Sequence, residues 1–212
     1  MRGREMAKLN KQEYEPRPLQ SLEKPVVLVI DLINGFIHEG ALADPEIDEA
    51  AKNTEKLLKN PRLAQTPVWF VCDTHSKDAK EFSAFPAHCL KGTAEAEVVD
   101  RLQPWVKPDH RIEKNAIGFM SSPDAQKFLS SLKGDEQVIV TGCCTDLCVL
   151  QGALGLQSWA NQNDMNSLEI LVPTDCVETY HIPEVHDAAF WNEYSLKNMA
   201  ANGISVISSL AD

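Results

Sequence analysis

No stretch of the 212-residue sequence approaches the ~20 consecutive apolar residues that a bilayer-spanning helix needs. The first residues also lack the apolar core of a secretory signal peptide, because residues 1–24 are polar and rich in Glu, Lys and Arg. We interpret residues 1–24 as a solvated arm. These features predict a soluble, cytoplasmic protein.

The sequence is poor in positive charge: 20 Lys and Arg residues stand against 31 Asp and Glu residues, which gives a net charge of −11. Nucleic acids and anionic membranes carry negative charge of their own, so we expect neither as a partner. The six cysteines show no paired C-x-x-C spacing and do not suggest the disulfide framework of a small secreted domain. We expect most of them to pack as small buried side chains.

What the sequence does contain is an alternation of short, β-branched apolar segments with segments of helical apolar spacing. The predicted strands are residues 25–32, 67–72, 111–112, 137–141, 167–172 and 204–207. The predicted helices are residues 46–58, 93–102, 123–132, 146–160 and 185–201, with Thr93 as a candidate N-cap of the second. This order predicts a single three-layer α/β/α domain over residues 25–212, built on a six-stranded, mostly parallel sheet.

In parallel sheets of this kind, ligands bind beyond the carboxyl ends of the strands. Asp31, Asp73 and Lys114 follow the first three predicted strands, and the loop 142–148 follows the fourth. We therefore expect these groups to converge on one crevice.

The loop after the fourth strand reads GCCTDLCV and leads into a predicted helix that Thr145 or Asp146 could cap. Cys148 then lies in the first helical turn, where the helix dipole lowers the pKa of a thiol and free N–H groups can bind an oxyanion. Taken alone, the loop is equally compatible with a cysteine that packs on the sheet. Taken alone, Asp31 could cap a turn and Lys114 could be a surface lysine. The three together favour covalent catalysis by a thiol.

A second group of polar residues follows the second strand. Asp73 and His75 are two residues apart, and His88 returns in the segment FPAHC. Either histidine alone is compatible with an ordinary loop residue. Two imidazoles and a carboxylate together suit zinc, iron or manganese, so this group indicates a site for one divalent metal.

At these residues the sequence resembles the isochorismatase-like cysteine hydrolases, and within them the nicotinamidases. The resemblance runs from about Val26 to Ile207. Its motifs are Asp31 with Phe36 in DLINGF, Lys114 in EKNAIGF, and the loop GxxTDxCV over residues 142–149.

The resemblance implies a mechanism. Cys148 would attack a carboxamide carbon, Asp31 would accept the thiol proton and pass it to the departing ammonia, and Lys114 would keep both groups ionised. The backbone N–H groups of Cys144 and Cys148 would bind the oxyanion, with a cis peptide bond between Cys143 and Cys144. A thioester intermediate would then be hydrolysed by water.

The resemblance also implies a metal site and a substrate pocket. The metal ligands would be Asp73, His75, Glu81 and His88, with zinc as the first choice and iron or manganese as alternatives. The substrate ring would lie between Phe36, Phe85 and Ile117. Two positions depart from the family pattern: Ile117 stands where tyrosine is frequent, and Thr74 stands where an aromatic residue is usual.

These motifs predict hydrolysis of nicotinamide to nicotinate and ammonia, with pyrazinamide as a further substrate. One alternative is a related hydrolase for another small amide or an N-carbamoyl compound; a carboxylate on that substrate would need an arginine, and Arg111 is the nearest. A non-catalytic binding domain with the same fold is the other alternative. The family resemblance further implies a homo-oligomer, either a dimer or a tetramer.

Overall fold

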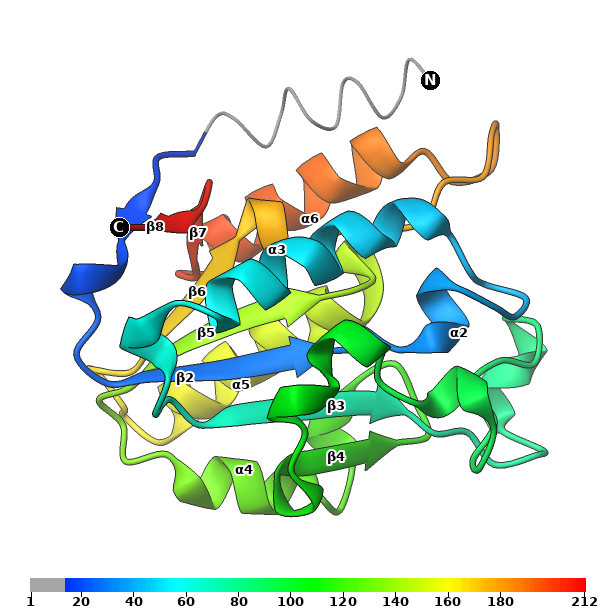
Figure 1. The fold of residues 1–212 in the computed structure, drawn as a ribbon, viewed down its shortest axis with the longest axis horizontal. Helices are drawn as coiled ribbons and strands as arrows, with labels where there is room; N and C mark the ends of the chain where they lie inside the picture. The colour runs from blue at the N-terminus through cyan, green and yellow to red at the C-terminus, as the bar shows by residue number, and fades with distance from the viewer. Residues whose placement is uncertain (1–13) are drawn as a thin grey trace.

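The computed structural model describes residues 14–212, and every structural statement below concerns that part of the chain. Its centre is a six-stranded sheet in which all neighbouring strands are parallel (Figure 1). The strands lie in the order β4 (Arg111–Lys114), β3 (Val68–Asp73), β2 (Pro25–Ile30), β5 (Gln137–Gly142), β6 (Glu169–Pro173) and β7 (Ser205–Ile207). The predicted single-domain α/β architecture is confirmed.

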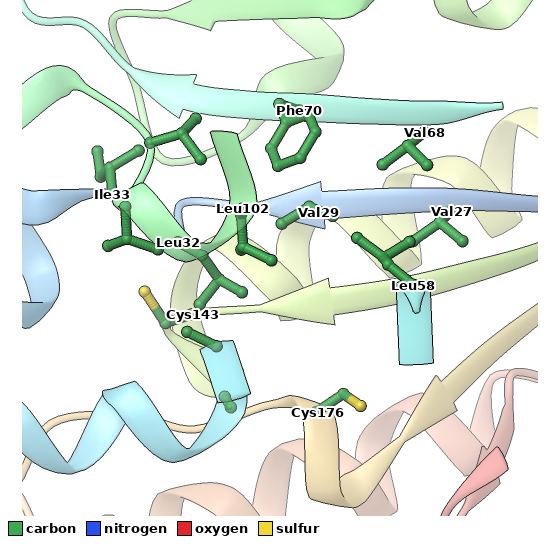
Figure 2. Packing of buried hydrophobic residues seen from close by; sticks show 14 of the residues in the cluster. Val27, Val29, Leu32, Ile33, Leu58, Val68, Phe70, Leu102, Cys143 and Cys176 are labelled. Atoms are coloured by element: carbon green, nitrogen blue, oxygen red, sulfur yellow. The ribbon is translucent and has the colours of Figure 1, made fainter. Parts of the chain in front are cut away.

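Side chains of the central strands alternate between two buried clusters, because successive residues of a strand point to opposite faces. Val27 and Val29 of β2 enter one cluster, while Leu28 and Ile30 enter the other. Helix α3 (Asp48–Leu58) covers the first cluster, where Figure 2 shows the two valines close to side chains of β3. The second cluster is covered by α4 (Ala125–Ser131), α5 (Leu150–Gln162) and α6 (Ala188–Ala201).

The strand register brings the predicted reactive residues to one edge of the sheet. Asp73, the last residue of β3, pairs directly with Lys114, the last residue of β4. At the end of β5, Gly142 has a φ of 131°, and a Cβ at this position would lie 1.9 Å from the carbonyl oxygen of Ile30. Glycine is therefore required where the nucleophile loop leaves the sheet beside β2.

The predicted helix 93–102 is wrong. The chain there forms two 3-10 turns, Ala94–Ala96 and Asp100–Trp105, and Thr93 makes no capping bond. Between the turns the backbone is extended, because Val98 bridges Ile33 and the N–H of Val99 donates to Leu32 O. Tertiary pairing with the segment after β2 thus overrides the local helical pattern.

Two predicted helix starts also need correction. Helix α6 begins at Ala188, three residues later than predicted, because Asp187 caps it by accepting a hydrogen bond from Ala189 N. The predicted helix 146–160 opens instead as a π-helical turn, Thr145–Val149, followed by α5. Neither Thr145 nor Asp146 caps it.

The prediction of a solvated arm over residues 1–24 is wrong for its second half, and residues 1–13 lie outside the described residues. Strand β1 (Arg17–Pro18) pairs in parallel with β8 (Leu210–Ala211), and Leu19 is buried in the first cluster. A short helix, α2 (Asn34–Ile37), follows β2 toward the site. In residues 14–212, no helix has both the length and the apolar character that a membrane crossing demands.

Candidate active site

Asp31 lies at the carboxyl end of β2 and is fully buried. Its φ of 53° places a non-glycine residue in the left-handed region, a conformation that persists where the surroundings impose it. Its carboxylate Oδ1 accepts a hydrogen bond of 2.8 Å from the backbone N–H of Asp73. The side chain is therefore held in one place by the neighbouring strand.

Lys114 connects the reactive groups. Its ammonium Nζ lies 2.8 Å from Asp31 Oδ2, forms a second ion pair with Asp73, and donates to Cys148 Sγ over 3.5 Å. Burial by itself would lower the pKa of Lys114, but the carboxylates of Asp31 and Asp73 raise it well above its usual value. Lys114 is thus a permanent cation inside the protein, and the surface-lysine interpretation is wrong.

Burial raises the pKa of Asp31 to about 6, against the opposing effect of Lys114. At neutral pH the carboxylate is therefore ionised, yet it is more basic than an exposed aspartate. A carboxylate oxygen of Asp31 lies within 4.8 Å of Cys148 Sγ. A buried base next to a thiol is suited to remove the proton from that thiol.

The ionisation state of the Cys148 thiol differs from the one expected at a helix N-terminus. Burial raises the pKa of Cys148 well above its usual value, and Lys114 only partly opposes this effect. The charges of Asp31 and Asp73 act in the same direction as burial. The resting group is therefore a neutral thiol that needs a base, rather than a thiolate formed by a helix dipole.

The nucleophile loop has the backbone that the family resemblance implies. The peptide bond between Cys143 and Cys144 is cis. Cys143 Sγ donates to Asp31 O over 3.0 Å, which fixes its side chain against β2. Within the described residues, the N–H of Cys144 has no hydrogen-bond acceptor, so it is free to bind an oxyanion.

The predicted metal ligands also come together. Donor atoms of Asp73, His75, Glu81 and His88 all lie within 4.8 Å of one another. The two Nε2 atoms of the histidines are 3.1 Å apart, and each lies 3.5–4.0 Å from carboxylate oxygens of Asp73 and Glu81. Ligands at about 2.0–2.2 Å from one ion are separated by about 3.0–3.5 Å, so the spacing suits a single cation with a slight contraction of the group.

The outer partners of both imidazoles support this interpretation. His88 Nδ1 lies 2.8 Å from Pro86 O, which can only accept a hydrogen bond. His75 Nδ1 lies 3.1 Å from Asn115 Oδ1, an atom that also accepts from the backbone N–H of Ser76. Both Nδ1 atoms are therefore donors, and the two Nε2 atoms, which face each other, are the ring atoms available to a cation. This arrangement fits a bound cation.

Glu81 completes the donor set. Its Oε2 accepts a hydrogen bond of 2.9 Å from Ile117 N, while Oε1 faces the two imidazoles. Burial opposes a rise in the pKa of His75, but the carboxylates of Asp73 and Glu81 raise it, so the gap attracts positive charge. A second set of potential ligands, Asp31, Asp73 and Cys148, surrounds the ammonium of Lys114 and needs no metal.

Both groups reach one narrow pocket, although Asp31, Lys114 and His75 are not among its lining residues. Its reactive lining comprises Asp73, Glu81, His88, Cys144 and Cys148. The predicted ring walls Phe36, Phe85 and Ile117 also line it. The structure thus brings the predicted site residues together, while their roles in a reaction stay predictions.

Several residues of the site escaped the sequence analysis. Leu42, Leu147 and Tyr180 form the rest of the pocket wall. Asn115 orients His75, and the ring of Phe82 packs against both metal-site imidazoles. Asn115 could have been found from its position beside Lys114 at a strand end, and Leu147 from its position in the predicted helix 146–160, whereas Leu42, Phe82 and Tyr180 lie on segments without a periodic pattern.

Arg111, the candidate for binding a substrate carboxylate, does not line the pocket. Its guanidinium donates to Glu97 over 3.0 Å and to Ala96 O over 2.8 Å. The structure therefore gives no support to Arg111 as a substrate ligand.

The family model described as the isochorismatase domain matches residues 25–209. The chain belongs to the isochorismatase family. This finding confirms the resemblance and the fold that it implied.

This isochorismatase-family chain is similar to proteins with different names. It is 24% identical to Nicotinamidase 1 of Arabidopsis thaliana over 94% of this chain and 91% of that protein. It is 25% identical to a probable inactive nicotinamidase of the same plant over 82% and 88%. N-carbamoylsarcosine amidase from Thermoplasma acidophilum has 26% identity and a TM-score of 0.66 over 87% and 96%. Pyrazinamidase of Pyrococcus horikoshii in complex with zinc has 22% identity and a TM-score of 0.67 over 87% and 99%.

Proposed function

We propose that the protein is a metal-dependent cysteine amidohydrolase that converts nicotinamide to nicotinate and ammonia. One observation carries the proposal: the reactive group, through the sulfur-bearing Cys148 that Lys114 contacts, and the candidate metal-ligating group both reach the same narrow pocket. Asp73 belongs to both, since one of its oxygens pairs with Lys114 and the other faces His88.

In the proposed reaction, Cys148 Sγ attacks the carboxamide carbon while Asp31 takes the thiol proton. Lys114 stabilises the charges on sulfur and on Asp31 during this transfer, because it contacts both side chains. The carbonyl oxygen becomes an oxyanion, which the N–H groups of Cys144 and Cys148 bind. In this scheme the carboxylate of Asp31 is charged before the reaction, and Cys148 Sγ becomes charged only during it.

Collapse of the tetrahedral adduct breaks the C–N bond. Asp31 returns its proton to the departing nitrogen, which leaves as ammonia, and a thioester to Cys148 remains. Asp31 then removes a proton from an attacking water, the C–S bond breaks, and the carboxylic acid is released. The thiol regains its proton, so the cycle closes without another reactant.

A divalent metal held by Asp73, His75, Glu81 and His88 would supply an attachment point for a ring nitrogen. The chain's own contribution is orientation: Phe36 and Phe85 offer flat apolar surfaces beside His88, at centroid distances of 5.6 and 6.4 Å. A pyridine ring fixed in this way presents its carboxamide to the sulfur. Proximity of this kind accounts for a large share of the rate increase in enzymes.

The relatives agree with this choice of substrate and metal. The plant relative carries the name Nicotinamidase 1, and the Pyrococcus horikoshii pyrazinamidase was solved with zinc. We accordingly propose zinc as the first metal to test. The probable inactive relative raises the alternative of a binding domain, but here the thiol, base, ammonium and metal-ligating residues are all present.

An N-carbamoyl amino acid is a weaker candidate, although an N-carbamoylsarcosine amidase is among the similar structures. Such a substrate carries a carboxylate that needs a cation. Lys114 is already paired with Asp31 and Asp73, and Arg111 is bound outside the pocket. The described pocket lining contains no lysine or arginine.

The test is release of ammonia from a panel of amides by zinc-loaded protein. We expect turnover of nicotinamide and pyrazinamide, and no turnover of N-carbamoylsarcosine. Mass spectrometry of protein quenched during turnover should detect the acyl group on Cys148. Ammonia release from the carbamoyl compound alone would overturn the proposal. The predicted dimer or tetramer is checked on the same preparation by sedimentation.

A further inference from the structure

The two ends of the pocket are lined differently. Aromatic rings at the metal end, those of Phe36, Phe82 and Phe85, all contact His88. Leu147 belongs to the nucleophile loop and Tyr180 is connected to that loop through His186, and both line the pocket, as does Leu42. Among the described lining residues, Tyr180 alone carries a hydroxyl, and that hydroxyl makes no hydrogen bond within residues 14–212.

The ring of Tyr180 packs against other aromatic rings. It stacks on His186 with a centroid distance of 3.9 Å and an interplanar angle of 20°. His186 in turn stacks on Trp191, at 5.5 Å and 14°. Stacked rings restrict the motion of a side chain, so the phenol has a defined position at the pocket wall.

The same histidine ties this wall to the nucleophile loop. His186 Nε2 lies 2.9 Å from Asp146 Oδ2, and its Nδ1 lies 2.9 Å from Tyr180 O. The second carboxylate oxygen of Asp146 accepts from Thr179 Oγ1. Asp146 stands two residues before Cys148, so one buried hydrogen-bond network connects the nucleophile loop with Tyr180.

We propose that Tyr180 is a specificity-determining residue whose hydroxyl donates a hydrogen bond to an acceptor atom next to the substrate carboxamide. This inference rests on the proposed function, because it assumes a ring held at the metal end with its carboxamide at Cys148. Burial raises the pKa of Tyr180 to about 12, with Cys144 and Asp146 adding to the effect, so the hydroxyl remains a donor. The apolar wall side chains Leu42 and Leu147 offer no hydrogen bond.

Two ring amides form a matched pair for the test. Pyridine-3-carboxamide and pyrazine-2-carboxamide both carry a ring nitrogen meta to the carboxamide, which suits the metal. The pyrazine has a second nitrogen ortho to the carboxamide, where the pyridine has a C–H group. Tyr180 should therefore increase the affinity for the pyrazine amide, because its hydroxyl can donate a hydrogen bond to the ortho nitrogen.

Affinity of both amides is measured by calorimetry in zinc-loaded Cys148→Ala protein, which cannot turn them over. We expect Tyr180→Phe to weaken pyrazine-2-carboxamide by about threefold to tenfold and to leave pyridine-3-carboxamide nearly unchanged. Tyr194→Phe, the same change at a residue that is 51% exposed on α6, should alter neither affinity. Equal losses for both amides, or no loss, would overturn the inference. Absence of binding by either amide before the tyrosine change would overturn the proposed function, and this inference with it.

The supporting role of His186 has its own measurement. His186→Ala should reduce the preference for the pyrazine as Tyr180→Phe does, because the phenol loses the ring on which it stacks. His186→Phe keeps a flat ring and should restore the preference, while melting curves establish that both variants are folded. A preference that survives His186→Ala would show that Tyr180 needs no such positioning.

Discussion

The nucleophile end and the metal end of the pocket are built in different ways. At the nucleophile end, Asp31 follows β2 and Lys114 ends β4, with β3 between these two strands, and Cys148 follows β5 within a few residues. At the metal end, only Asp73 belongs to a strand, while His75, Glu81 and His88 belong to the excursion between β3 and β4.

That excursion is nevertheless closed at its base. His75 N donates to Cys89 O, and Lys91 N donates to His75 O, each over 2.9 Å. This short parallel bridge between residues 75 and 90 brings His75 and His88 together although 13 positions separate them. The sheet therefore fixes the proposed reacting groups, and a loop bonded to the sheet fixes the groups that are proposed to hold the metal and the substrate.

Substitutions at the two ends of the pocket should therefore affect different kinetic constants. Changes at the nucleophile end remove interactions that exist only during the reaction, so they should lower kcat. Changes at the metal end remove interactions with the bound ring, so they should mainly raise KM. Asp73 takes part in both ends, and its substitution would not separate them.

The largest effect is expected from Cys148→Ala, which removes the atom that forms the thioester. Ammonia release should fall to the uncatalysed level, while calorimetry should still detect binding of nicotinamide to the zinc-loaded protein. Cys176→Ala, which removes a buried thiol in the first core cluster, is the matched control and should keep kcat. Retained turnover in Cys148→Ala would show that the nucleophile is a different group.

Asp31→Asn should have the next largest effect. The amide cannot accept the thiol proton, and loss of general base catalysis costs about 10²–10⁴-fold in rate. We expect the loss in kcat, with KM within a few-fold of the starting value, measured by ammonia release at saturating nicotinamide. A loss confined to KM would place Asp31 in binding rather than in proton transfer.

The nucleophile end was largely predictable from sequence because strands of a parallel sheet finish at one edge. Asp31 and Lys114 needed only correct strand assignments, and the short spacing from residue 142 to Cys148 left little freedom. What local pattern did not reveal was the state of the thiol. Its pKa depends on complete burial and on two carboxylates from other strands, which outweigh a helix terminus.

The metal end was less accessible to physical reasoning alone. A loop can return a histidine to a strand end in many ways, so Glu81 entered only through the family resemblance. Tyr180 and Leu42 lie on connecting segments without hydrophobic periodicity and were missed. The failed helix at 93–102 has the same cause, because Val98 and Val99 pair with residues that are distant in sequence.

At the metal end, His88→Ala tests whether the effect falls on metal affinity and KM. It removes one of the four proposed metal-ligating side chains and the ring that Phe36 and Phe85 contact. We expect zinc affinity to fall by about 100-fold or more and KM for nicotinamide to rise, with a smaller change in kcat at saturating zinc and substrate. Zinc affinity is measured by competition with a chelator. A kcat loss as large as that of Asp31→Asn, with KM unchanged, would contradict the division of labour between the two ends.

The smallest and most selective effect is expected at Asn115, which touches no ligand atom of the cation. Its Oδ1 holds His75 Nδ1 and the N–H of Ser76, so Asn115→Ala should free the imidazole to rotate. Loss of such an outer partner typically costs about tenfold or more in metal affinity. Asn166→Ala, which removes an exposed amide after α5, is the control and should leave zinc affinity unchanged. If chelator competition gives the same zinc affinity for both variants, the backbone alone orients His75, and the loop at the metal end is as rigid as the sheet at the nucleophile end.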